Sequence, residues 1–355
     1  MNEHSTMTQQ ASQREHIRSL FAHTAAAPGF WIGNPHADTW TQYRSVTGMD
    51  EETIRTELGD ECRFISAEWF SYQHPEKKSM FNPYLGVTRE KGSHAEAGCF
   101  AECDSIREVE SHPWPSLSYL DFTSTIDRIL AHADKAIFSG FWSPFFHRVS
   151  DYFGMENFFI KMYTHPAVVD AVTAHIVDFY VEANRRFLAA AGDNVDVLFI
   201  ANDLGTQQDV IISPELFERF ILPGIRRLAA VGREFGKPVM MHSCGAISRI
   251  IPQLIDAGIC ALHPLQPTRG MDAATLAREY KNDLVFVGGV DTQELLPRGT
   301  SSDVSEEVKR LMDTLGPNYI VSPSHEGILP DIPFENVRAM ADAVHSTERY
   351  KARAL

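Results

Sequence analysis

The sequence predicts a single-domain (β/α)8 barrel, in which eight parallel strands form a closed sheet surrounded by helices. From residue 135 onward, short apolar strands and amphipathic helices alternate six times. Each of these strands is apolar on both faces, as expected of parallel strands covered by helices. Two earlier segments, 30–32 and 64–69, bring the number of candidate strands to eight, the strand number of this barrel.

The individual elements follow from local patterns. Strands are short apolar runs that end at glycine, proline or a polar residue. They are expected at residues 30–32, 64–69, 136–139, 196–201, 238–241, 258–263, 284–291 and 319–322. Helices have apolar residues three and four positions apart. They are expected at residues 14–26, 38–47, 50–58, 120–133, 150–163, 166–191, 213–222, 223–235, 247–257, 272–280, 302–315 and 333–344. Asp50 and Ser213 are predicted helix N-caps.

The N-terminal part of the chain is less regular than the rest. Residues 1–25 are expected to form an N-terminal extension, and residues 26–350 the barrel domain. Between residues 71 and 116 the hydrophobic periodicity is poor and several prolines occur. This segment is interpreted either as a hairpin excursion from the barrel or as a lid over the active site.

Composition excludes several classes of partner. The chain has 47 acidic and 32 basic residues, a net charge of −15, which argues against nucleic acid or an anionic membrane surface. Its five cysteines have no spacing typical of a disulfide framework, which fits reduced thiols. No apolar run approaches the length of a membrane span, and the N-terminus lacks the apolar core of a signal peptide. A cytoplasmic protein is therefore expected.

The clearest local signal is the sequence His242-Ser-Cys244-Gly245, directly after the apolar run 238–241. Side chains two positions apart at the end of a strand can point to the same side. Imidazole nitrogen and thiolate sulfur are both zinc donors, and Gly245 allows a sharp turn. The alternative interpretation is a hydrogen-bonded core histidine beside an inert buried cysteine.

Polar residues recur just past the carboxyl ends of the predicted strands. In a barrel these ends meet at one mouth, where active sites lie. The residues placed there are His36, Asp203, His242, Cys244, His263, Gln266, Asp291, His325 and Glu326. Their clustering predicts a functional site at the mouth.

Three segments together resemble the uroporphyrinogen decarboxylase superfamily. They are Asn202-Asp-Leu-Gly-Thr-Gln-Gln with the following Ser213-Pro-Glu-Leu-Phe, the motif His242-Ser-Cys-Gly, and Gly288-Gly-Val-Asp-Thr. The resemblance covers residues 120–345, and within the superfamily it is strongest to zinc-dependent, corrinoid-linked methyltransferases. It implies a methyl group moved between a small donor and a cobamide carried on a separate partner protein, and the enzyme could form a homodimer.

The resemblance also implies a zinc site. Zinc in that branch is held by a His-x-Cys pair, which corresponds to His242 and Cys244, and by a later Cys. His325 stands at the position of the later Cys, so the implied set is His242, Cys244 and His325. The arginine-rich N-terminal motif of the true decarboxylases is not found, which argues against tetrapyrrole decarboxylation. A decarboxylase of the same superfamily, or a catalytically silent barrel that binds a tetrapyrrole or a corrinoid protein, are the alternatives.

The remaining candidates are assigned by their position after strands. Asp203 and Glu326 are the predicted catalytic residues, and Asp203 could also be a fourth metal ligand or orient a ligand histidine. Gln207, Gln266 and Asp291 are predicted to bind substrate. For each of these five residues a purely structural role in a turn or loop is the competing interpretation.

Overall fold

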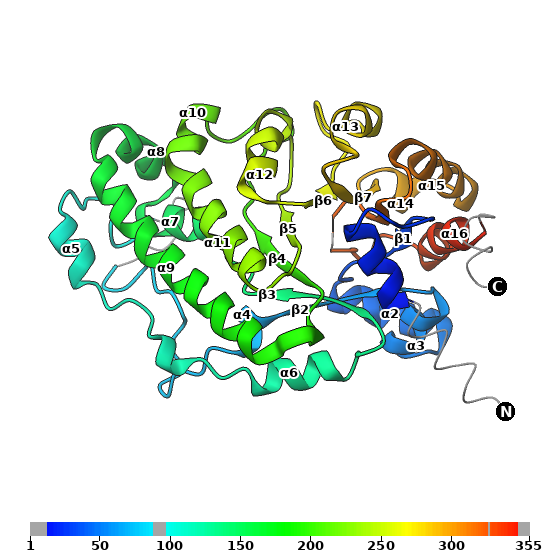
Figure 1. Ribbon diagram of the computed structural model, residues 1–355, viewed down its shortest axis with the longest axis horizontal. Coiled ribbons are helices and arrows are strands. Elements are labelled where there is room, and N and C mark those ends of the chain that lie inside the picture. The colour runs from blue at the N-terminus through cyan, green and yellow to red at the C-terminus, as the bar shows by residue number, and fades with distance from the viewer. Residues whose placement is uncertain (1–12, 88–96, 326, 347–355) are drawn as a thin grey trace.

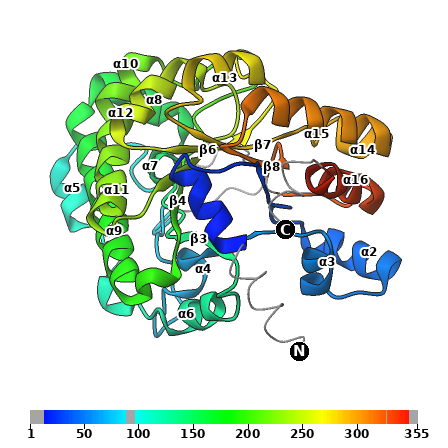
Figure 2. The same cartoon turned by 45° about the vertical axis from the view of Figure 1, so that its right-hand side comes forward.

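The computed structural model describes residues 13–87, 97–325 and 327–346 of the chain. Its centre is a sheet of eight parallel strands in the order β1-β8-β7-β6-β5-β4-β3-β2. The strands are β1 (Gly29–Phe30), β2 (Cys62–Ser66), β3 (Ala136–Gly140), β4 (Val197–Ala201), β5 (Val239–His242), β6 (Ala261–Leu265), β7 (Val285–Val290) and β8 (Tyr319–Pro323). Helices lie around the outside of the strands (Figures 1 and 2). The predicted (β/α)8 barrel is confirmed.

The sheet closes between β1 and β2 through acidic side chains. The backbone contributes one bond there, from the Glu61 amide to the Phe30 carbonyl at 3.1 Å. The Glu61 carboxylate accepts the Phe30 amide at 3.0 Å, and the Asp60 carboxylate accepts the Ile32 amide at 3.3 Å. Two carboxylates therefore take the place of most of a strand ladder, and we call this contact the β1–β2 seam.

The helices alternate with the strands, as the sequence pattern predicts. They are α2 (Ala37–Thr47), α3 (Glu51–Glu57), α4 (Ala67–Phe70), α5 (Ile106–Ser111), α6 (Thr123–Leu130), α7 (Phe145–Phe153), α8 (Met155–Thr164), α9 (Pro166–Ala191), α10 (Pro214–Leu216), α11 (Leu222–Glu234), α12 (Ile251–Ala257), α13 (Ala273–Tyr280), α14 (Leu295–Arg298), α15 (Ser301–Leu315) and α16 (Phe334–His345). Among the described residues, none of these helices has the length and apolarity that crossing a bilayer requires.

Both predicted caps are confirmed. The Asp50 side chain accepts the amide of Thr53, and the Ser213 side chain accepts the amide of Leu216. Each cap satisfies a backbone donor that has no partner within its helix.

The helix expected at 150–163 is wrong in its bounds. It begins earlier, at Phe145, and is divided into α7 and α8 at Gly154, whose φ is +79°. The side-chain oxygen of Asn202, just after β4, accepts the amide of Phe146 at 2.8 Å and fixes the start of α7. A contact between residues so far apart in the chain leaves no local sequence pattern.

The strand expected at 258–263 is also displaced, because β6 runs from Ala261 to Leu265. His263 was expected at the carboxyl end of this strand and instead lies in the middle of it. Its side chain points into the barrel, and the residue is 1% exposed.

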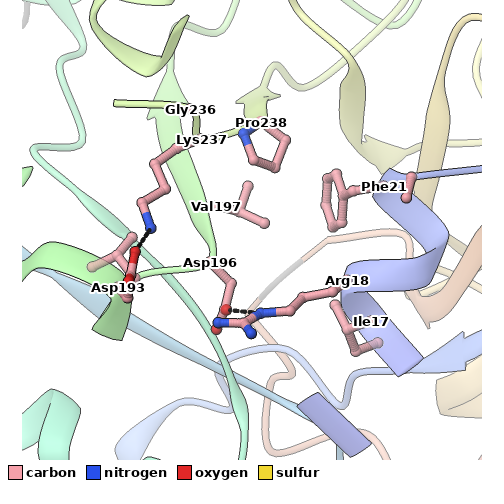
Figure 3. Close-up of a pocket in the computed structure, with 11 residues that line it drawn as sticks. Ile17, Arg18, Phe21, Asp193, Asp196, Val197, Gly236, Lys237 and Pro238 are labelled. Atoms are coloured by element: carbon pink, nitrogen blue, oxygen red, sulfur yellow. Dashed lines mark hydrogen bonds and ion pairs between the residues drawn. The ribbon is translucent and has the colours of Figure 1, made fainter. Parts of the chain in front are cut away.

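A helix over residues 13–21 covers the floor of the barrel. Ile17 and Leu20 pack with the side chains that fill the barrel interior. Asp196, at the start of β4, has a fully buried carboxylate that accepts bonds from Arg14 at 3.0 Å and Arg18 at 2.7 Å. Figure 3 shows Arg18 reaching Asp196 beside a cavity of about 520 Å³. The helix is therefore anchored to the floor by apolar packing and by ion pairs.

The segment between α4 and α6 leaves the barrel and returns beside its own start. Tyr72 and Leu120 form an antiparallel bridge at its base. Phe100 stacks on Tyr152 of α7 with ring centroids 5.4 Å apart, and Trp114 lies against α9. In the described residues the segment is thus an excursion packed on the helices that follow β3.

Candidate metal centre

The site is built on the end of β5. Side chains alternate along a strand, so Met240 and His242 both point into the barrel, where Met240 belongs to the interior cluster. Cys244 follows in a turn that Gly245 makes possible with a φ of +86°. A Cβ at Gly245 would collide with the backbone of Gly205 in the loop after β4. The predicted turn role of Gly245 is confirmed.

Three different donor groups converge at this turn. His242 Nε2 lies 3.4 Å from Cys244 Sγ and 3.1 Å from Asp203 Oδ1. One ligand atom from each of Asp203, His242 and Cys244 lies within 4.8 Å of the other two. Donors at tetrahedral positions about 2.0–2.3 Å from zinc are about 3.3–3.7 Å apart. The spacing and the chemistry of this donor set therefore fit a zinc ion.

Asp203 follows β4 and connects the two strand ends. Its Oδ1 atom also accepts the backbone amide of Cys244 at 2.9 Å, and His147 Nε2 lies 3.9 Å from its Oδ2. Burial raises the pKa of Asp203, but the adjacent His242, the hydrogen bond from the Cys244 amide and the nearby His147 together hold it well below its usual range. The carboxylate is thus ionised and available as a ligand.

His325 lies beside Cys244. Its ring is nearly perpendicular to that of His242, at an angle of 86°, with centroids 6.3 Å apart. Burial raises the pKa of the Cys244 thiol, but hydrogen bonds with His242 and His325 outweigh burial and lower it. The Nδ1 atom of His325 accepts the amide of Gly327 at 3.0 Å. His325 thus touches the thiol but is not one of the three clustered donors, and its role as a metal ligand stays a prediction.

The Nδ1 edge of the His242 ring, opposite the Nε2 atom that faces Asp203 and Cys244, packs inside the barrel. Its Nδ1 atom lies 3.0 Å from Nδ1 of His263, and the ring of Trp142 lies 5.0 Å away between centroids. Burial, and next the adjacent His242 and His325, lower the pKa of His263 well below its ordinary value. His263 is therefore a neutral imidazole.

Two of the predicted substrate-binding residues make structural contacts. Gln266 Oε1 accepts the amide of Gly245 at 2.6 Å and fastens the metal-site turn to the end of β6. The Asp291 carboxylate accepts the amides of Gln293, Glu294 and Leu295 and organises the turn before α14. These contacts match the competing structural interpretation, and substrate contact by either residue stays a prediction.

The structure does not assign the other two candidates to the cluster. Gln207 is exposed in the loop that follows β4. Glu326, the second predicted catalytic residue, lies outside the described residues. Both assignments stay predictions.

The profile of the uroporphyrinogen decarboxylase family (URO-D) matches residues 103–347, which is most of the chain. This protein belongs to the uroporphyrinogen decarboxylase family. The match includes every strand from β3 to β8 and all three clustered donors. Membership agrees with the resemblance found in the sequence motifs.

Curated relatives of this family member include methyltransferases and decarboxylases. It is 29% identical over 195 residues to the methylated-thiol–coenzyme M methyltransferase of Methanosarcina mazei, covering 55% of this chain and 49% of that protein. It is 29% identical over 141 residues to the uroporphyrinogen decarboxylase of Syntrophotalea carbinolica, covering 38% of each protein. It is 22% identical over 189 residues to the methylcobamide:CoM methyltransferase MtbA of Methanosarcina acetivorans, covering 53% of this chain and 52% of that protein. The chain thus matches about half or less of the length of these relatives.

A solved structure supports the fold. A methyltransferase from Methanosarcina mazei superimposes with a TM-score of 0.66 over 93% of this chain and 97% of that chain. The sequence identity is 16%, so the likeness concerns the barrel alone.

Two contacts of the family site were not assigned from the sequence. His263 looked like one more polar residue after a strand, although its register opposite His242 on the neighbouring strand could have indicated a contact. Trp142 follows the predicted strand 136–139, and it was not assigned to the site because an aromatic residue near a buried strand usually belongs to the core.

Proposed function

We propose that this protein is a zinc-dependent methyltransferase that moves a methyl group between a small donor and a cobamide carried by a partner protein. The observation that supports it most is the convergence of an imidazole, a lowered-pKa thiol and a carboxylate at the barrel mouth. The methyltransferase names among the relatives point the same way.

His242 and Cys244 would hold the zinc, and Asp203 is the best placed third ligand because it already belongs to the cluster. Zinc bound there would supply Lewis acidity towards a thiol or a methyl donor. His325 would donate a hydrogen bond to the Cys244 sulfur, because its Nδ1 lone pair already accepts the Gly327 amide and a neutral ring then carries its proton on Nε2. Its implied role as third ligand is the competing assignment.

Aromatic side chains next to the donors would line the space that the methyl-bearing substrate occupies. Phe64 of β2 and Trp142 are half-buried, and their ring centroids are 5.1 Å apart. Trp69 extends the same group towards solvent, with a side chain of which 61% is exposed. These faces would exclude water from the space beside His242 and offer apolar contact to a methyl-bearing substrate.

Decarboxylation is the second candidate, because one of the 29%-identical relatives is a uroporphyrinogen decarboxylase. That substrate carries several carboxylates, and each buried carboxylate needs a cationic or hydrogen-bonding partner. The groups that converge at this mouth are the carboxylate of Asp203, the imidazoles of His147 and His242 and the thiol of Cys244. The nearby cation, Arg148, is already paired with the carboxylate of Glu68 at 3.2 Å. The local charge therefore favours methyl transfer.

The test compares both reactions on one preparation. Zinc-loaded protein is supplied with a panel of methylated donors and a reduced cobamide, and methylcobamide formation is followed by absorbance. We expect formation that Cys244→Ala abolishes, and no carbon dioxide release from uroporphyrinogen. Carbon dioxide release that survives Cys244→Ala would reverse the assignment, since the thiolate has no part in decarboxylation.

A further inference from the structure

Two histidines of neighbouring strands meet behind the donor cluster. His242 is the last residue of β5 and His263 is the middle residue of β6, and the two are register partners in the sheet. Their side chains therefore leave the sheet side by side on its inner face. The two Nδ1 atoms are 3.0 Å apart, which is a hydrogen bond with one shared proton.

The direction of this bond follows from the other side of His242. Its Nε2 atom faces Asp203 and Cys244, so Nε2 is the atom that would bind a metal. A neutral imidazole that offers the Nε2 lone pair carries its proton on Nδ1. That proton points at His263, whose Nδ1 atom must then be the acceptor.

His263 is held where it can do this. It is 1% exposed, and its ring lies against Trp31 and Phe199 with centroid distances of 5.2 and 5.4 Å. Close packing of this kind prevents the ring from turning away. A ligand histidine usually donates its second proton to a carboxylate, a carbonyl or water. A neutral imidazole acceptor adds no negative charge and leaves a bound metal more electrophilic than a carboxylate acceptor would.

We propose that His263 is a positioning residue for the metal centre, whose Nδ1 atom accepts the Nδ1 proton of His242 and keeps His242 Nε2 aimed at the ligand cluster. This inference rests on the proposed zinc site and is independent of which reaction occurs there.

Three variants separate the hydrogen bond from packing. His263→Asn places a side-chain oxygen near the position of Nδ1 and keeps an acceptor. His263→Leu fills similar space without one. Ile320→Ala is the matched control, because it perturbs the same interior cluster and leaves both histidines and the rings packed on them in place. Zinc affinity is measured by competition with a chromogenic chelator, the Co(II) absorption spectrum reports ligand geometry, and thermal unfolding of the metal-free proteins reports the fold.

We expect His263→Leu to lower zinc affinity about 10–100-fold and to alter the Co(II) spectrum, as loss of a hydrogen bond to a ligand histidine does elsewhere. His263→Asn should restore most of both, and Ile320→Ala should lower the unfolding temperature with little change in zinc affinity. The metal-free His263→Leu protein should unfold at a somewhat lower temperature than wild type, because the buried Nδ1 proton of His242 loses its acceptor.

Equal zinc affinity in wild type and His263→Leu overturns the inference, as does a loss in Ile320→Ala as large as in His263→Leu. Wild-type protein that binds no zinc overturns it as well. If wild type binds zinc but transfers no methyl group, the proposed reaction is wrong while the affinity series still decides the role of His263.

Discussion

The identity of the third zinc ligand can be decided by comparing Asp203→Asn with His325→Ala. Four-ligand zinc sites bind with about 10–16 kcal/mol, so one ligand contributes about 3–4 kcal/mol, which is about 100–1,000-fold in affinity. Asp203→Asn keeps an oxygen for the Cys244 amide and removes the charge, so we expect a loss of this size. His325→Ala removes one hydrogen bond to the Cys244 sulfur, about 1.5 kcal/mol or about tenfold.

The assay is zinc titration against a chelator of known affinity, at one pH and ionic strength for all variants. Asp291→Asn is the control, because that carboxylate accepts backbone amides at a neighbouring strand end. It should bind zinc as wild type does. A larger loss in His325→Ala than in Asp203→Asn would refute our reasoning and establish the ligand set implied by the sequence resemblance, with His325 in place of Asp203.

Two further predictions concern the framework. Asp196→Ala leaves Arg14 and Arg18 without their buried partner, which should lower the free energy of unfolding by about 3–5 kcal/mol. The unfolding entropy is about 2.1 cal/mol/K per residue over 355 residues, so calorimetry should show an unfolding midpoint temperature about 4–7 °C lower. Asp193→Ala, at an exposed carboxylate next to the same cavity, should change it little, and equal shifts would contradict the role of Asp196. Gly245→Ala should lower zinc affinity sharply, because φ is +86° and the new Cβ meets the Gly205 backbone; unchanged affinity would show that this turn does not set the position of Cys244.

The barrel could be predicted because its signal is local and repeated. The five residues of β4 are all buried, and α9 has the predicted bounds Pro166–Ala191. A short run of apolar residues indicates a buried segment, whichever segments of the chain pack against it. The start of α7 could not be predicted in this way, because it depends on Asn202, which is distant in the chain and close only after folding.

The site was predicted in part for a similar reason. The motif around His242 and Cys244 lies within one turn, and the structure brings those two side chains together. Asp203 was expected at the same mouth with several possible roles, and the sheet register brings it within 3.1 Å of His242. His263 was placed at the end of its strand by a boundary error of two residues, and such an error decides whether a histidine is assigned to the mouth or to the interior of the barrel.

The β1–β2 seam makes the opening of this barrel adjustable by point substitution. A backbone ladder is insensitive to the side chains that flank it, whereas this closure depends on the carboxylates of Asp60 and Glu61. Shortening or neutralising either side chain would loosen one side of the cylinder while six consecutive parallel pairings, from β2 round to β8, stay intact. Hydrogen–deuterium exchange at the amides of Phe30 and Ile32 would report that loosening directly. A relative with a wider or more flexible barrel could therefore arise by substitution of Asp60 and Glu61, with no change in the strands themselves.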